Sequence, residues 1–92
     1  MKPLLQEYMS HGAIIVDVRS PEEFKNGHCK NSINIPLNVL EARSHELKVD
    51  QHTIVCCASG GRSAMAMSLL KSKGFTNVIN AGAWTNAQSA CN

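Results

Sequence analysis

The chain has 92 residues, which is the size of one domain. Hydrophobic residues make up 43% and charged residues 17%, and these values exclude a disordered, acidic or low-complexity chain. No apolar run approaches the roughly 18 residues of a membrane span, and the N-terminus lacks the apolar stretch of a signal peptide. The sequence therefore predicts a single domain over residues 1–92. It also predicts a cytoplasmic location, or a periplasmic one if a signal peptide has been removed.

The charges are unevenly distributed along the chain. The formal net charge is +2 and four residues are aromatic, so neither nucleic acid nor a membrane is an expected partner. All seven Asp and Glu residues lie at or before residue 50, and residues 51–92 contain Arg62, Lys71 and Lys73 without any acid. A local balance of +3 favours a small anionic ligand over a cationic one.

The first half of the chain alternates predicted helices and strands. Apolar residues at helical spacing (Leu4, Leu5, Tyr8 and Met9) predict a helix over residues 3–10. The apolar, β-branched run over residues 13–18 predicts a buried strand. Ser20 and Glu23 have the spacing of a capping box, with Pro21 at the first helical position, and this helix ends at Asn26. Residues 33–36 predict a brief strand that a proline closes.

The second half continues the alternation. Asn38 is predicted to cap a helix that runs to about residue 47, and residues 53–56 form a second buried strand. Residues 63–73 form the clearest helix, which ends at Gly74, before a strand over 77–79 and a helix over 83–90. Alternating strands and helices predict an α/β fold. We expect a three-layer sandwich with a small, mostly parallel central sheet and helices on both faces.

One loop joins a buried strand to the N-terminus of the clearest helix, and its residues are Cys57, Ala58, Ser59, Gly60, Gly61 and Arg62. Ligands of open α/β sheets bind at the carboxyl ends of strands, where this loop lies. Small residues leave the backbone N–H groups accessible, the helix N-terminus adds a positive field, and Arg62 supplies forked donors for an oxyanion. A cysteine in such a field has a lowered pKa. Cys57 is therefore the predicted nucleophile, whereas alternation along the strand turns Cys56 into the packing between sheet and helix.

The sequence resembles a single rhodanese domain over about residues 4–84. The resemblance rests on Val16-Asp17-Val18-Arg19, Glu22-Glu23-Phe24, Gly27-His28, Ile33-Asn34-Ile35-Pro36, Cys57 with Gly60, Arg62 and Ser63, and Gly74-Phe75-Thr76-Asn77-Val78 with Asn80-Ala81-Gly82. It implies a thiosulfate sulfurtransferase in which Cys57 carries a sulfane sulfur as a persulfide. The donor is thiosulfate or a similar small anion, and the acceptor is cyanide, a thiol or a protein. The resemblance also implies that the amides of residues 58–62 bind the sulfur.

Other positions that match the family pattern are interpreted as structural. Asp17 and Arg19 can form an ion pair, and His28 is expected to be a hydrogen-bonding residue that follows a turn glycine. Several positions depart from the family pattern, among them Cys29, Asn31 and Ala83, which replaces the second glycine of a usual Gly-Gly pair. Cys29 stands where an aliphatic residue is usual, and Asn31 stands where glycine is preferred, although asparagine tolerates the left-handed conformation.

Two alternatives from other classes remain open. Counted from Cys56, the spacing to Arg62 is that of a cysteine-dependent phosphatase or arsenate reductase. In the second alternative, the domain is a sulfur carrier or a docking module that works with a protein partner. No cofactor is predicted, and the scattered histidines offer no metal-binding spacing. The sequence does not assign a redox role to Cys29 or Cys91.

Overall fold

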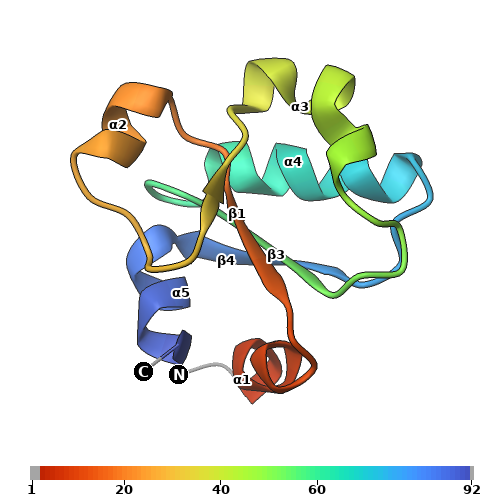
Figure 1. The fold of residues 1–92 in the computed structure, drawn as a ribbon, viewed down its shortest axis with the longest axis horizontal. Helices are drawn as coiled ribbons and strands as arrows, with labels where there is room; N and C mark the ends of the chain where they lie inside the picture. Colours follow the sequence, from red (N-terminus) through yellow and green to blue (C-terminus); the bar gives the residue numbers. More distant parts are fainter. Residues whose placement is uncertain (1–2, 92) are drawn as a thin grey trace.

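The computed structural model describes residues 3–91. Its strands are β1 (Ile14–Asp17), β2 (Ile33–Asn34), β3 (Thr53–Cys57) and β4 (Val78–Ala83). Its helices are α1 (Pro3–Ser10), α2 (Pro21–Lys25), α3 (Leu37–Arg43), α4 (Gly61–Ser72) and α5 (Trp84–Cys91), with a 3₁₀ turn, η1 (Ser44–Glu46). The strands form one sheet in the order β2-β1-β3-β4, and every pairing is parallel (Figure 1).

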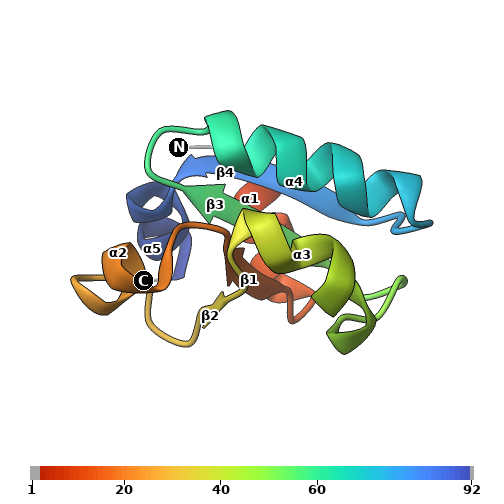
Figure 2. The same ribbon diagram turned by 90° about the horizontal axis from the view of Figure 1, so that it is seen from above.

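Helices cover both faces of the sheet, which confirms the predicted three-layer α/β sandwich. Figure 2 looks down on α3 and α4, with α1 on the far side of the sheet. Val16, Val55 and Leu70 belong to the apolar cluster under α3 and α4, whereas Ile15 and Ile54 belong to the cluster that packs against α1 and α5. All five residues of β3 are buried, as the continuous apolar run predicts for a central parallel strand. No helix in residues 3–91 is long and apolar enough to cross a bilayer.

Several element boundaries differ from the prediction. The helix expected to start after an Asn38 cap instead includes that residue: α3 begins at Leu37, and Pro36 is its N-cap without a side-chain bond. The fixed φ of proline provides the entry into the helix there. Helix α4 begins at Gly61, two residues earlier than expected, because Gly60 takes a left-handed conformation (φ 114°) that only glycine adopts without strain.

Strand β4 is longer than predicted and contains an irregularity. It continues to Ala83, and its register against β3 shifts between Val55 and Cys56, whose partners are Asn80 and Gly82. The extra residue, Ala81, makes this a β-bulge, a feature that changes the direction of neighbouring side chains. The bulge lies beside the last residues of β3, so it affects the end of the sheet where the chemistry is expected.

A buried ion pair secures the turn that follows β1. The Nε and Nη2 atoms of Arg19 donate to both carboxylate oxygens of Asp17 at 2.8–3.0 Å, and Nη2 also donates to the carbonyl of Gly27 at 2.7 Å. The guanidinium lies 5.1 Å from the ring centroid of Trp84. The pairing that the sequence predicts is therefore present, and its side chains are 6% and 0% exposed. It connects the end of β1 to the segment after α2 and to α5.

Replacing Arg19 with alanine leaves the Asp17 carboxylate buried without its counter-charge. We expect the free energy of unfolding, measured by urea denaturation, to fall by about 3 kcal/mol, because breaking one side of a buried pair is costly. Arg43→Ala is the matched control, since it breaks an exposed pair with Glu46 and is expected to change stability little. Equal losses in the two variants would contradict this account.

Candidate active site

The site lies at the carboxyl end of the sheet, between β3 and α4. Figure 2 shows the chain leaving β3, turning through residues 58–60 and re-entering the fold as α4. Cys57 is the last residue of β3, and its side chain is 1% exposed among the apolar residues under α3 and α4. Ala58 and Ser59 are exposed at the outside of the loop. The turn therefore holds the thiol at the first turn of a 12-residue helix.

The sulfur of Cys57 accepts hydrogen bonds from the loop that surrounds it. The backbone N–H of Gly60 donates to Sγ at 2.9 Å and that of Ser63 at 3.4 Å. The hydroxyl oxygen of Ser63 lies 3.3 Å from the same sulfur. Because several donors converge on one atom at a helix N-terminus, the arrangement suits a negatively charged sulfur.

These contacts change the acidity of the thiol. Burial raises the pKa of Cys57, but the hydroxyl of Ser63 and the backbone N–H groups of Ser63, Gly60 and Ser59 lower it by more. The net result is a pKa below the ordinary value of a thiol. The thiolate is the nucleophilic form of cysteine, so the loop increases the fraction that can react at neutral pH.

Two polar residues, Ser63 and Asn80, complete the network; the sequence placed both in the family motifs but did not predict them as site residues. Ser63 Oγ lies 2.6 Å from Oδ1 of Asn80, and that oxygen also accepts the backbone N–H of Gly82 at 2.8 Å. The amide of Asn80 donates to the carbonyl of Gly60 at 3.4 Å. The bulge in β4 thus connects to the loop that holds the thiol. Ser63 was visible in the sequence as the residue after Arg62, whereas the register shift that brings Asn80 close has no sequence signal.

The two adjacent cysteines lie on opposite faces of the sheet. Cys56 is fully buried in the cluster that packs against α1 and α5, and burial, as the largest cause, raises its pKa to about 12. Cys57 lies on the α4 side with a lowered pKa. The alternation of side chains along β3 therefore separates one inert thiol from one that is suited to nucleophilic attack.

Arg62 does not have the free guanidinium that the sequence suggested. Its Nη1 and Nη2 atoms donate to the two carboxylate oxygens of Glu23 at 2.7 and 3.0 Å. Glu23 belongs to α2, where it completes the predicted capping box with Ser20. The cation that was expected to meet an oxyanion is therefore already paired with a carboxylate from an element 39 residues away.

Other predicted residues have local roles. Nδ1 of His28 lies 2.7 Å from the carbonyl of Phe24, and the two rings are stacked with centroids 3.7 Å apart. Asn31 has a φ of 67°, so asparagine does provide the left-handed turn that was expected there. Gly61 is the first residue of α4 and does not take a positive φ.

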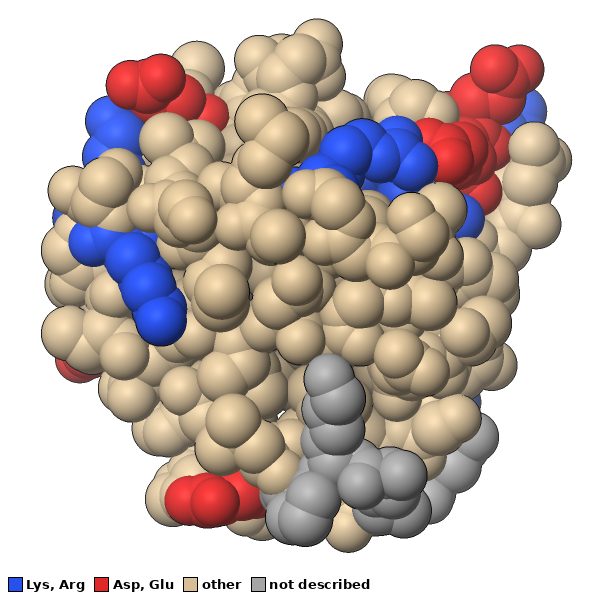
Figure 3. All heavy atoms as spheres, turned by 180° about the vertical axis from the view of Figure 1, so that it is seen from behind, with Lys and Arg blue, Asp and Glu red and all other residues tan. Residues whose placement is uncertain are grey.

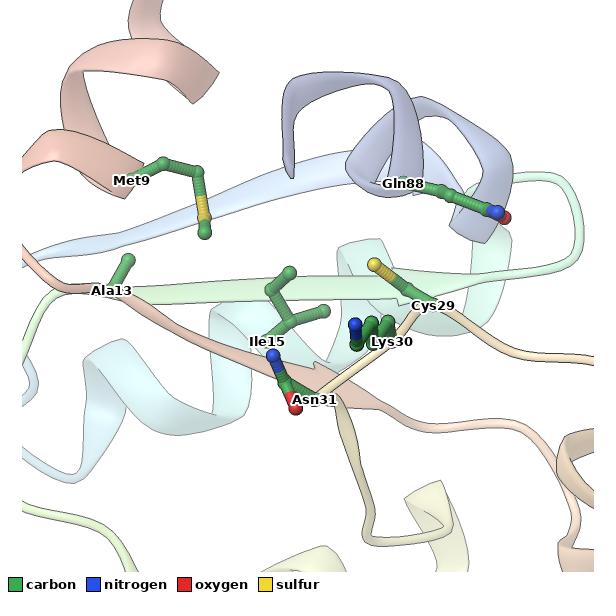
Figure 4. A pocket seen from close by; sticks show the side chains of 7 residues that line it. All are labelled: Met9, Ala13, Ile15, Cys29, Lys30, Asn31 and Gln88. Atoms are coloured by element: carbon green, nitrogen blue, oxygen red, sulfur yellow. The ribbon is translucent and has the colours of Figure 1, made fainter. Parts of the chain in front are cut away.

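Cys29 lies on the side of the sheet opposite Cys57. It is fully buried and belongs to the same cluster as Cys56. Figure 4 shows its side chain pointing into a pocket of about 450 Å³, whose other lining residues are Met9, Ala13, Ile15, Lys30, Asn31 and Gln88. The sheet therefore lies between Cys29 and the thiol of Cys57. The side chain of Cys91 lies outside the described residues. Among the described residues no three His, Cys, Asp or Glu side chains cluster as metal ligands would.

A thiol held at the N-terminus of a helix, at the end of a central parallel strand, is the arrangement expected of a domain of the α/β class that reacts through a cysteine. Comparison with known proteins names the family. Residues 2–89 match the rhodanese-like domain, and the chain belongs to this family of rhodanese-like sulfurtransferases. The resemblance that was drawn from the sequence is confirmed.

Relatives and solved structures agree on this family. The chain is 36% identical to thiosulfate sulfurtransferase PspE of Escherichia coli K12, over 73% of this chain and 66% of that protein. It is 41% identical to the putative sulfur carrier protein YrkF of Bacillus subtilis, over 72% of this chain and 36% of that protein. The match thus spans two thirds or less of these curated relatives. The human single-domain sulfurtransferase TSTD1 superposes with a TM-score of 0.78 at 30% identity, covering 91% of this chain and 88% of that one.

Replacing Ser63 with alanine removes the hydroxyl that lowers the pKa of Cys57. We expect the pKa of this thiol to rise and its alkylation by iodoacetamide at neutral pH to slow by about threefold to tenfold, because each hydrogen bond to a charged group contributes about 1 kcal/mol or more. The measurement is the pH profile of the alkylation rate. Ser59→Ala is the matched control, since Ser59 acts through its backbone N–H. A profile that stays in place in Ser63→Ala would refute this role.

Proposed function

We propose that this domain transfers a sulfane sulfur from a small anionic donor, such as thiosulfate, to a thiophilic acceptor through a persulfide on Cys57. The observation that carries the proposal is the set of contacts around Sγ of Cys57, with N–H donors at 2.9 and 3.4 Å and the hydroxyl oxygen of Ser63 at 3.3 Å. The lowered pKa of this thiol supports the same role. Membership of the sulfurtransferase family supports the type of reaction.

The proposed reaction has two balanced steps. The Cys57 thiolate attacks the outer sulfur of thiosulfate, a sulfur–sulfur bond forms, and sulfite leaves with the electron pair of the bond that breaks. The persulfide then gives its outer sulfur to cyanide, forming thiocyanate, or to a thiolate, forming a new persulfide, and the Cys57 thiolate returns. A covalent intermediate divides one transfer into two easier displacements, and neither step consumes a cofactor or metal.

The proposed substrate-binding residues are Ala58, Ser59, Gly60, Gly61 and Arg62, which follow Cys57 in the loop. We propose that the N–H groups that reach Sγ of Cys57 also bind the outer sulfur of the persulfide. Ala58 and Ser59 are exposed, so a protein acceptor can approach the loop as well as a small one. We further propose that residues 1–92 form one rhodanese-like domain. Its cytoplasmic location stays a prediction from the sequence.

The alternative readings have less support. A phosphatase or arsenate reductase would use Cys56, but that thiol is fully buried and burial raises its pKa to about 12. The sulfur-carrier reading differs from our proposal mainly in the acceptor. One relative of this chain is named a putative sulfur carrier protein, and this name supports the alternative.

Replacing Cys57 with serine is expected to abolish sulfur loading, because serine cannot form a persulfide. Cys56→Ser is the matched control and is expected to retain most of the loading, with a loss of stability from placing a hydroxyl in the core. The measurement is the intact mass after incubation with thiosulfate, before and after cyanide. Loading that persists in Cys57→Ser and disappears in Cys56→Ser would overturn the assignment.

A further inference from the structure

Arg62 is the single charged residue between Cys57 and Ser63, and its guanidinium is already paired with the carboxylate of Glu23. Both oxygens of Glu23 accept from its guanidinium, at 2.7 and 3.0 Å. This is the two-pronged geometry with which a guanidinium binds an oxyanion such as a carboxylate or phosphate. Glu23 therefore balances the charge of Arg62 and engages two of its five N–H donors, so this guanidinium is less available to the sulfonate end of thiosulfate.

Glu23 is itself held in place by the capping box of α2. Its Oε1 accepts the backbone N–H of Ser20 at 3.0 Å and the hydroxyl of the same residue at 3.1 Å. The hydrogen bond from Arg62, first among the causes, and those from Ser20 lower the pKa of Glu23 to about 2. The carboxylate therefore remains ionised at every pH at which the thiol of Cys57 can react. An incoming anion must displace a fixed, permanently charged competitor.

The other residues of the loop are uncharged. Residues 58–61 are alanine, serine and two glycines, and the nearby guanidinium of Arg19 is buried against Asp17. Figure 3 shows basic and acidic atoms side by side toward the α2 side of the molecule, while most of that face is uncharged. The positive character of the site thus comes from the loop amides and the N-terminus of α4, which meet the reacting sulfur and not the far end of the donor.

We propose that Glu23 is a specificity-determining residue: by pairing with Arg62 it makes the site favour thiol persulfides over oxyanion donors such as thiosulfate. This inference rests on the proposed function. The leaving group of a thiol persulfide is a thiolate with a single negative charge, so it depends less on a cation than sulfite does. The Cys57 thiolate attacks the outer sulfur of the donor persulfide, the sulfur–sulfur bond of the donor breaks, and the donor thiolate leaves with the electron pair. With thiosulfate, the leaving group is the sulfite dianion, and Arg62 stabilises its charge less because Glu23 already balances the charge of the guanidinium.

The test replaces Glu23 with glutamine. Glutamine preserves the capping box but removes the charge that occupies Arg62. Glu22→Gln is the matched control, because it removes the same charge from the neighbouring, exposed position of α2. For each variant, kcat/KM is measured with thiosulfate and with glutathione persulfide, using cyanide as the acceptor.

We expect Glu23→Gln to raise kcat/KM for thiosulfate by about tenfold, the effect of one charge-assisted hydrogen bond, and to change the value for glutathione persulfide less than twofold. The double variant Glu23→Gln/Arg62→Ala is expected to lose this gain, since the freed guanidinium produces it. An unchanged thiosulfate value in Glu23→Gln, or an equal rise in Glu22→Gln, overturns the proposal.

A second measurement needs no variant. Sulfate is a tetrahedral oxyanion that binds to an available arginine, so its effect on the alkylation of Cys57 by iodoacetamide reports whether Arg62 is free. At matched ionic strength we expect sulfate to protect Cys57 no better than chloride, and strong protection overturns the proposal. Absence of sulfur loading on Cys57 with both donors would instead refute the proposed function. Loading with glutathione persulfide and no response to Glu23→Gln refutes this inference alone.

Discussion

The structure depends on the stabilisation of one sulfur atom that is almost completely buried. A thiolate at 1% exposure loses most of its hydration, and only donors that are already in place can replace it. The loop after Cys57 supplies them because Gly60 takes a left-handed conformation and directs its own N–H and the first turn of α4 toward the sulfur. The hydrogen bonds that lower the pKa of the thiol are also suited to bind a second sulfur. The conformation of the loop therefore accounts for both the acidity of the thiol and the proposed chemistry.

Two ion pairs have different roles at this end of the sheet. The pair between Asp17 and Arg19 is buried, and it fixes the turn after β1 against the segment that follows α2. The pair between Glu23 and Arg62 is more than a third exposed, so its contribution to stability is small. Its larger consequence is chemical, because it decides whether a cation is available at the entrance. The buried pair thus stabilises the turn after β1, whereas the exposed pair controls how much positive charge is available to a ligand.

Sequence reasoning reached those features that depend on near neighbours along the chain. The capping box of α2 and the ion pair of Asp17 with Arg19 span three residues or fewer, and the opposite orientation of Cys56 and Cys57 follows from strand alternation. It failed where distant segments meet. The contact of Arg62 with Glu23 joins residues 39 positions apart, and that of Ser63 with Asn80 depends on a bulge in β4. A local sequence pattern does not show which distant segments meet or how the register of neighbouring strands shifts.

The central claim, that the loop lowers the pKa of Cys57, can be measured directly. The ultraviolet absorbance of thiolate is followed against pH in the intact protein and in Cys57→Ser, and the difference between the two curves is the titration of this single thiol. The account predicts a midpoint below the value of about 8.5 for a free cysteine, because the amides and the Ser63 hydroxyl outweigh burial. A midpoint above that value, in the direction of Cys56, would show that burial dominates and would contradict the account.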